Sequence, residues 1–230
     1  MRYPVIDVII PAFNEENAVG SVVKDLPQSW VREVVVVDNN SRDATRRSAE
    51  EAGATVLDES RQGYGYACLK GIEYIKAKPT PPDIIVFIDA DYSDYPEELP
   101  QLVTHLTEHN LDLVIGSRAL GKREAGSMTP QQVFGNWLAT TLIRRLYGVH
   151  YTDLGPFRAV RFQKLLDMDM QDTTYGWTVE MQLKAAKMGF RTGEVPVTYR
   201  RRIGHSKISG TFKGTLLAGY KILSWIFKYR

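Results

Sequence analysis

Short, uninterrupted apolar runs separated by segments with helical periodicity are the feature that most constrains the fold of this chain. Strands are expected over Val5–Ile10, Glu33–Val37, Gly53–Leu57, Asp83–Ile88 and Leu111–Gly116. Helices are expected between them, over Glu15–Leu26, Asp43–Ala52, Tyr64–Lys76 and Pro96–Glu108. Continuous apolar strands that alternate with helices are typical of a mainly parallel sheet covered on both faces. The first half of the chain therefore predicts an α/β fold.

The second half of the chain has a different pattern. Helices are expected over Pro130–Tyr147, Thr178–Lys187 and Ser209–Tyr229, with loop and strand character in "YTDLGPFRAVR". The segment "RTGEVPVTYRR" predicts a strand at the edge of the sheet, because Pro196 cannot donate a ladder hydrogen bond. The expected organisation is one domain over residues 1–208, followed by an amphipathic C-terminal helix over 209–230.

Polar residues follow four of the predicted strands at the point where each strand ends. The segments are "PAFNEE", "DNNS", "DADYSD" and "GSR". Right-handed crossovers bring the carboxyl ends of parallel strands to one rim of the sheet, where ligands usually bind. Taken singly, Asn14, Ser41 or Asp43 can equally be a helix cap. Four such clusters on one rim favour a binding cleft.

The segment "IIVFIDADYSD" places three acidic residues directly after a buried strand. Asp89 and Asp91 flank Ala90, so in an extended segment both side chains point the same way. Mg²⁺ prefers oxygen ligands and usually takes one or two carboxylates together with phosphate oxygens. The pattern predicts a platform for a metal bound to a diphosphate. The alternative is a pair of solvated acids in a turn.

Composition and charge narrow the class of protein. A chain of 230 residues with 43% hydrophobic residues can build one sizeable core. Eight of its 29 Lys and Arg residues lie in Tyr199–Arg230, which contains no acidic residue and suggests an anionic partner. Cys68 is the only cysteine, which favours a reducing compartment. With no signal peptide and no long apolar stretch evident, we expect a cytoplasmic protein.

The predicted C-terminal helix over 209–230 has two possible roles. Phe212, Leu216, Leu223 and Phe227 fall near one stripe at helical spacing, and lysines accompany them. Such a helix can lie in a membrane interface, which would attach the protein peripherally to the inner face of the cell membrane. Alternatively, the stripe packs on the domain or on a second copy of the chain.

The four rim segments, in this order and spacing, resemble the family 2 glycosyltransferases with a GT-A fold, from Val5 to Ser209. The stretches "DLGPFRAV" and "RRRIGHSK" resemble the branch that acts on polyprenyl or dolichyl phosphate as mannosyl- or glucosyltransferases. The resemblance implies a metal-dependent, inverting hexosyltransferase that uses a UDP- or GDP-hexose.

The resemblance also implies roles for individual residues. Asp89 and Asp91 would hold Mg²⁺ or Mn²⁺, and Asp38 would accept a hydrogen bond from the base. Many members have a second acid after the latter, where this chain has Asn39. The remaining nucleotide-sugar contacts would come from Pro11, Asn14, Glu15, Gly63 and Gly65. The two glycines can equally serve a tight turn before a helix.

The chemistry of the leaving group predicts a need for positive charge. Breaking a sugar–phosphate bond leaves negative charge on the nucleoside diphosphate, which a metal, Arg and Lys stabilise. Arg202 and Lys207, with His205 between them, are the candidates to close over the diphosphate. Arg118 can face either the diphosphate or the acceptor.

Two classes of acceptor remain open from the sequence. A lipid phosphate is already an anion, so it needs positive groups, for which Arg118 with Arg144 or Arg158 are candidates. A hydroxyl acceptor needs a carboxylate to take its proton, and the candidates are Glu180 and Asp153.

Other functions fit the sequence less well. A non-catalytic nucleotide-sugar binding module has less need for paired aspartates aimed at a leaving group. A dinucleotide-dependent dehydrogenase would carry G-x-G-x-x-G after the first strand, where this chain has "PAFNEE". An aspartate-nucleophile phosphatase could use the D-x-D but leaves "PAFNEE" and "VVDNNS" unexplained. No nucleic-acid recognition module is evident, so nucleic acid is not an expected partner.

Overall fold

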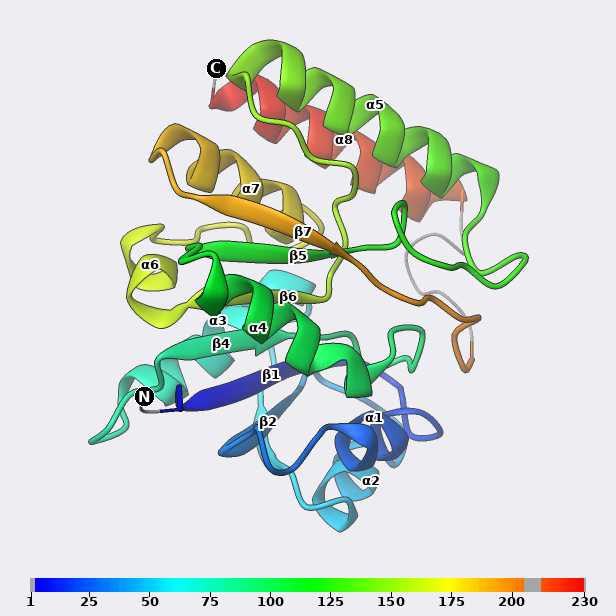
Figure 1. Cartoon of the computed structure of the whole chain (residues 1–230). Helices are drawn as coiled ribbons and strands as arrows, with labels where there is room; N and C mark the ends of the chain where they lie inside the picture. The colour runs from blue at the N-terminus through cyan, green and yellow to red at the C-terminus, as the bar shows by residue number, and fades with distance from the viewer. Residues whose placement is uncertain (1–2, 205–211, 230) are drawn as a thin grey trace.

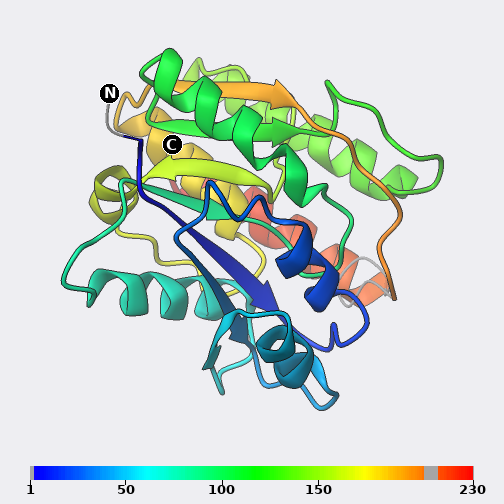
Figure 2. The ribbon, with the colours of Figure 1, turned by 60° about the horizontal axis from the view of Figure 1, so that its bottom comes forward.

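A seven-stranded sheet forms the centre of this computed structural model, which describes residues 3–204 and 212–229, with only the backbone over 212–218. The strands are β1 (Ile6–Ala12), β2 (Glu33–Asp38), β3 (Thr55–Asp58), β4 (Ile84–Phe87), β5 (Leu113–Ser117), β6 (Arg158–Arg161) and β7 (Thr192–Pro196). Their order across the sheet is β3-β2-β1-β4-β6-β5-β7. The helices lie on both faces of this sheet (Figures 1 and 2).

The predicted parallel arrangement is confirmed, with one exception that the sequence left open. β6 runs antiparallel to both of its neighbours, β4 and β5, whereas the other pairs are parallel. β7 lies at the edge of the sheet, as Pro196 predicted. β1, β2, β4 and β5 therefore end on the same rim, as their parallel orientation requires.

The helices follow the predicted order, except that a short helix over Phe162–Asp167 was not predicted and that two helices begin later than expected. They are α1 (Val19–Asp25), α2 (Thr45–Glu51), α3 (Tyr64–Lys76), the 3₁₀ turn η1 (Pro96–Glu98), α4 (Leu99–Glu108), α5 (Pro130–Tyr147), α6 (Phe162–Asp167), α7 (Trp177–Lys187) and α8 (Phe212–Lys228). α1 and α2 begin after the predicted Glu15 and Asp43, because the residues before them form bonded turns on the rim.

Alternate residues of each central strand feed two separate apolar clusters. Ile9 and Phe87 point to the cluster beneath α3, α5, α7 and α8, where Trp177 packs edge-on against Phe87. Ile10 and Val86 point to the cluster beneath α1, α2 and α4. Burial on both faces explains why the strands read as continuous apolar runs instead of alternating ones.

The C-terminal half of α8 packs on the protein. Trp225 and Ile226 are buried, α8 lies beside α5 and α7, and the Tyr147 hydroxyl donates to the Ile226 carbonyl at 2.6 Å (Figure 1). The indole Nε1 of Trp225 donates to the buried carboxylate of Asp172, which also receives an ion pair from Lys221. The division of the chain at residue 208 stays a prediction, since residues 205–211 lie outside the described ones.

Replacing Trp225 by Phe should destabilise the protein by about 1–2 kcal/mol, because the buried Asp172 loses a donor while most of the apolar contact is kept. Urea denaturation followed by far-ultraviolet circular dichroism, which reports backbone structure and not tryptophan fluorescence, measures this change in the free energy of unfolding. Tyr220→Phe on the same helix, at a side chain 73% exposed, is the control and should fall within about 0.5 kcal/mol of the wild type. Equal stability of all three proteins would contradict the anchoring role of Trp225.

Candidate active site

The first two rim segments form one continuous wall at the ends of β1 and β2. Ala12 pairs with Asp38 in the parallel ladder, so the loops that follow both strands start side by side. Asn14 accepts from the Arg42 amide at 2.8 Å, and the Glu15 amide donates to the Thr45 hydroxyl at 2.7 Å. The side-chain oxygens of these loops therefore tie the two segments to each other, while neither α1 nor α2 has a side-chain cap.

Asn39, which directly follows β2, holds the loop before α3. Its side-chain Nδ2 donates to the carbonyl of Arg61 at 2.7 Å, and its Oδ1 accepts from the Gly63 amide at 2.7 Å. Asn39 is buried, whereas the preceding Asp38 accepts from the Ser41 amide at 3.0 Å. The uncharged side chain of Asn39 thus has a structural role, because its amide group holds this loop through hydrogen bonds.

The structure gives a reason for Gly63 and Gly65 that the sequence did not suggest. A Cβ at Gly65 would lie 1.9 Å from the Asp172 carbonyl oxygen, and one at Gly63 would lie 2.2 Å from that of Thr173. Gly63 also has a φ of 153°, which side-chain-bearing residues rarely adopt. Close packing of the segment before α7 therefore requires both glycines, independently of any nucleotide.

Asp89 lies at the end of β4, partly exposed, with its carboxylate held by a neighbouring helix. The hydroxyl of Tyr64, the first residue of α3, donates to Asp89 Oδ1 at 2.9 Å. Desolvation and the negative charge of Asp91 together raise the pKa of Asp89 to about 6. The raised pKa records a repulsion between the paired carboxylates that a bound cation would relieve.

Asp91 is buried and bonded on both carboxylate oxygens. Its Oδ1 accepts from the amide and hydroxyl of Ser93 at 2.9 and 2.5 Å, and its Oδ2 forms an ion pair with Arg202 at 2.8 Å. The backbone amide of Ile203 donates to the Asp91 carbonyl at 3.0 Å. The segment after β7 therefore lies directly over the D-x-D turn.

Asp94, the third acid, is 1% exposed, and neither carboxylate oxygen has a hydrogen-bond partner among the described residues. Desolvation and the nearby charge of Asp89 raise the pKa of Asp94 well above its usual range. Its protonated form carries no charge. The raised pKa of Asp94 favours its uncharged form, and Arg202 pairs with Asp91, so fewer like charges meet in this turn than its three acids suggest.

The three consecutive arginines after β7 have separate roles. The Arg200 guanidinium lies over the rings of Tyr92 and Tyr95, at 3.4 and 4.1 Å from their centroids. Arg201 donates to the Ala125 carbonyl, and only Arg202 reaches the paired aspartates. Burial alone would lower the pKa of Arg202, but the charge of Asp91 raises it, so this guanidinium is charged. His205 and Lys207 lie outside the described residues.

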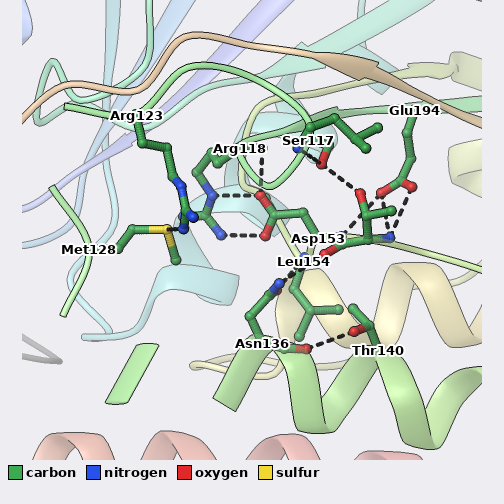
Figure 3. Close-up of polar contacts among 12 residues, drawn as sticks. Ser117, Arg118, Arg123, Met128, Asn136, Thr140, Asp153, Leu154 and Glu194 are labelled. Atoms are coloured by element: carbon green, nitrogen blue, oxygen red, sulfur yellow. Dashed lines mark hydrogen bonds and ion pairs between the residues drawn. The ribbon is translucent and has the colours of Figure 1, made fainter. Parts of the chain in front are cut away.

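Arg118 and Asp153 form a bidentate ion pair on the other side of the site (Figure 3). The Nε and Nη2 atoms of Arg118 each lie 2.7 Å from an Asp153 oxygen, and its amide donates to the same carboxylate at 2.8 Å. Burial alone would raise the pKa of Asp153, but Arg118 lowers it. A carboxylate with a lowered pKa is a poor proton acceptor, so these contacts favour Asp153 as the group that positions Arg118.

Glu180 and Arg158 are buried among backbone groups and are not placed to touch an acceptor. Glu180 accepts from the amides of Gln171 and Asp172 at 2.8 and 2.7 Å and pairs with Lys184 at 2.8 Å. Arg158 is fully buried and donates to the carbonyls of Gly155 and Thr178. These contacts favour a structural role for both residues, in contrast to the roles that their charge suggested.

A cavity of about 310 Å³ opens beside Asp153, between the loop after β5 and helix α5. Its basic lining groups are Arg123, Arg144 and His150, all exposed, and neither arginine has an ion pair to another described residue. Trp137 and Val133 contribute apolar walls. Sequence reasoning identified Arg144 as a possible acceptor contact and Asp153 as a possible base. It missed the other lining residues, because their helix and loop converge only in three dimensions.

The paired aspartates fit a divalent cation that is shared with a diphosphate. In the described part of the chain no cluster of three or more His, Cys, Asp or Glu side chains is placed to hold a metal. Mg²⁺ commonly takes one or two carboxylates and completes its shell with water and phosphate oxygens. Asp89 and Asp91, with the unrelieved repulsion between them, therefore match a site that the substrate helps to build.

Among the described residues, no helix combines the length and the apolar character needed to span a bilayer.

Comparisons with known proteins agree on one family. The model of the glycosyl transferase family 2 matches residues 7–168. An undecaprenyl-phosphate mannosyltransferase of Micrococcus luteus is 32% identical over 221 residues, covering 90% of this chain and 88% of the relative. A dolichyl-phosphate hexose transferase of Haloferax volcanii is 33% identical over 221 residues, covering 94% and 91% respectively.

A solved structure shares the fold. It is the glucosyl-3-phosphoglycerate synthase of Mycobacterium tuberculosis in complex with Mn²⁺, UDP and glucosyl-3-phosphoglycerate. The TM-score is 0.76 at 22% identity, and the match covers 98% of this chain and 80% of that one. The predicted GT-A fold is thereby confirmed.

Replacing Asp94 by Asn should stabilise the protein at neutral pH. A carboxyl group whose pKa is higher in the folded than in the unfolded state destabilises the fold as pH rises above its unfolded value of about 4. Asn has nearly the same shape and carries no proton to lose. Thermal unfolding at pH 7.5 should show a Tm a few degrees above that of the wild type, shrinking towards pH 4. A lower Tm at pH 7.5 would contradict a neutral, unpartnered Asp94.

Proposed function

Because the chain belongs to glycosyl transferase family 2, and is therefore a glycosyltransferase, we propose that it transfers a hexose from a nucleoside diphosphate sugar to a polyprenyl phosphate, with inversion at the sugar. The observation that carries this proposal is the set of charges around the D-x-D turn. Arg202 pairs with one of the two neighbouring aspartates, Asp91, and Arg118 is held by Asp153. The charge of each of these arginines also lowers the pKa of Asp89.

The nucleotide is assigned to the wall formed by the loops after β1 and β2. Asp38 would accept from the base, and Pro11, Asn14 and Glu15 would line the adjoining part of the wall, an assignment that the pairing of Ala12 with Asp38 supports. Glu15 is close enough to Arg202 to raise the pKa of that guanidinium. The wall formed by the loops after β1 and β2 therefore lies close enough to the D-x-D turn for their charges to interact. This suits a donor with a base at one end and a diphosphate at the other.

Asp89 and Asp91 would hold Mg²⁺ or Mn²⁺ together with the diphosphate. The fold relative described above was crystallised with Mn²⁺ and UDP, which supports this assignment. A divalent cation there would offset the negative charge that develops on the departing nucleoside diphosphate. Tyr64 keeps the Asp89 carboxylate in place through its 2.9 Å hydrogen bond.

Arg202 is assigned to the leaving diphosphate. Its guanidinium is charged and partly exposed, and it lies 2.8 Å from Asp91. A phosphate oxygen bound next to Asp91 would share the guanidinium, whose fork of donors suits bidentate contacts with phosphate. Lys207, five residues further along, stays a predicted contact of the same diphosphate.

The state of the two candidate bases supports a phosphate acceptor over a hydroxyl acceptor. Asp153 is engaged by Arg118 and has a lowered pKa, and Glu180 is buried and bonded. A phosphate monoester attacks as an anion and needs no carboxylate to remove a proton. It needs positive groups instead, and the cavity beside Asp153 supplies Arg123 and Arg144.

Replacing Asp91 by Asn should lower the rate of hexose transfer at least about 100-fold, because one of the two carboxylates that would hold the cation is lost. Release of nucleoside diphosphate from UDP- and GDP-hexoses, with Mn²⁺ and a prenyl phosphate, measures the effect. Asp83→Asn is the matched control at the opposite end of the same strand, where the side chain accepts from the Val5 amide. Full turnover by folded Asp91→Asn protein would refute metal-assisted departure.

Replacing Arg144 by Gln should raise the KM for the prenyl phosphate about three- to tenfold and leave the KM for the donor unchanged, since an exposed charge contributes roughly 1 kcal/mol. Arg145→Gln is the control, because Arg145 is equally exposed and does not line the cavity. Initial rates with each substrate varied in turn separate the two constants. Transfer to hydroxyl acceptors alone would rule out the phosphate assignment.

A further inference from the structure

The N-terminal half of α5 exposes large apolar side chains to solvent. Val133, Phe134 and Trp137 are 42%, 60% and 57% exposed, at positions that share one side of the helix. Together with Met128 and Pro130 they border a shallow hollow, and we call these five residues the α5 apolar face. Large apolar side chains gathered at one place on a surface usually mark an interaction site.

Contacts at the start of α5 and on its inner side keep the α5 apolar face exposed to solvent. A capping box between Thr129 and Gln132 and the proline at the first turn fix the start of α5. On the other side of the helix Ile143 is buried, while Asn136 bonds the Thr152 carbonyl and the Leu154 amide at 2.9 and 2.8 Å. The helix cannot turn its exposed residues inward without breaking these contacts. Figure 1 places α5 at one edge of the molecule, beside α8.

The charges around the face are almost all positive. Residues 118–150 contain five Lys and Arg residues, and Glu124 is their only acid. Glu124 faces Arg201, at 3.6 Å, so its charge is already offset. Exposed cations remain at Lys122, Arg123, Arg144 and Arg145. An apolar face rimmed by cations complements an anionic lipid surface, whereas a second copy would bring like charges together.

The face is continuous with the cavity that carries the acceptor in our proposed function. Met128, Val133 and Trp137 line both the hollow and the cavity of about 310 Å³ beside Asp153. A lipid in a bilayer against the face would therefore have its phosphate level with the basic groups of the cavity. Arg123 and Arg144 lie in that cavity lining.

From these observations we infer that the α5 apolar face docks on the surface of an anionic membrane and admits a lipid phosphate directly into the acceptor cavity. The inference rests on the proposed function for the identity of the acceptor, but not for the contact with lipid. It moves the membrane contact from α8, which the sequence favoured, to α5. In the described part of α8, Trp225 and Ile226 are buried against the protein.

Vesicle sedimentation of the full chain tests the contact. Phe134→Glu should bind vesicles of phosphatidylcholine and phosphatidylglycerol about tenfold more weakly than the wild type, since an apolar anchor is lost and an anion is added. Tyr3→Glu is the control: Tyr3 is 88% exposed and precedes β1, and it belongs to neither α5 nor the lining of the hollow. Tyr3→Glu should bind like the wild type, and vesicles of phosphatidylcholine alone should bind the wild type more weakly.

A second measurement separates this inference from the proposed function. Phe134 does not line the acceptor cavity, so Phe134→Glu should transfer hexose to a water-soluble, short-chain prenyl phosphate at the wild-type rate. It should lose most transfer to a long-chain prenyl phosphate held in vesicles. If the wild type uses neither acceptor, the proposed function fails while the vesicle-binding result still decides the docking surface.

Three results would overturn the inference. Equal sedimentation of wild type and Phe134→Glu would show that the face does not touch lipid. Equal loss of binding in Tyr3→Glu would show that added charge alone is responsible. A dimer in analytical ultracentrifugation that Phe134→Glu converts to monomer would assign the face to a second copy of the chain.

Discussion

The crowding of carboxylates at the end of β4 is the constraint on which the site depends. Asp89, Asp91 and Asp94 follow a buried strand within six residues, and their charges cannot all persist unopposed. The fold lessens this crowding in two ways: Arg202 pairs with Asp91, and burial raises the pKa of Asp94, which favours its uncharged form. Burial and the charge of Asp91 together raise the pKa of Asp89 to about 6. The remaining repulsion between Asp89 and Asp91 favours the binding of a cation at this turn. The sheet places the turn beside the loops after β1 and β2, to which we assign the nucleotide.

The acceptor side of the site also depends on how its charges are paired. The bidentate pair between Arg118 and Asp153 fixes a guanidinium at the border between the D-x-D turn and the cavity under α5. Neither arginine of that cavity, Arg123 or Arg144, forms an ion pair with another described residue. The D-x-D turn thus carries carboxylates that a bound cation would stabilise, and the cavity carries arginines that a bound anion would stabilise. A metal–diphosphate donor and a phosphate acceptor satisfy both.

The strands, most helices and the rim were predictable because they depend on local pattern: continuous apolar runs, helical spacing, and polar residues where strands end. What the sequence could not give was long-range pairing. Glu180 and Asp153 suggested proton acceptors until their partners, the Asp172 amide and Arg118, were known. The antiparallel β6 and the close approach of Asp172 to Gly65 likewise join segments far apart in the chain. Asp38, Asp89 and Asp91 lie where β2 and β4 end, as the pattern predicted, and their roles stay proposals.

The most direct test of this account is the titration of the Asp89 carboxyl carbon by NMR, in the protein without metal and again with Mg²⁺ and a nucleoside diphosphate. Without metal the account predicts a pKa of about 6. With Mg²⁺ and the nucleotide the pKa should fall by more than one unit, because the bound cation stabilises the charged form. A pKa near the ordinary value of about 4 in the free protein, unchanged on adding both ligands, would contradict the central claim.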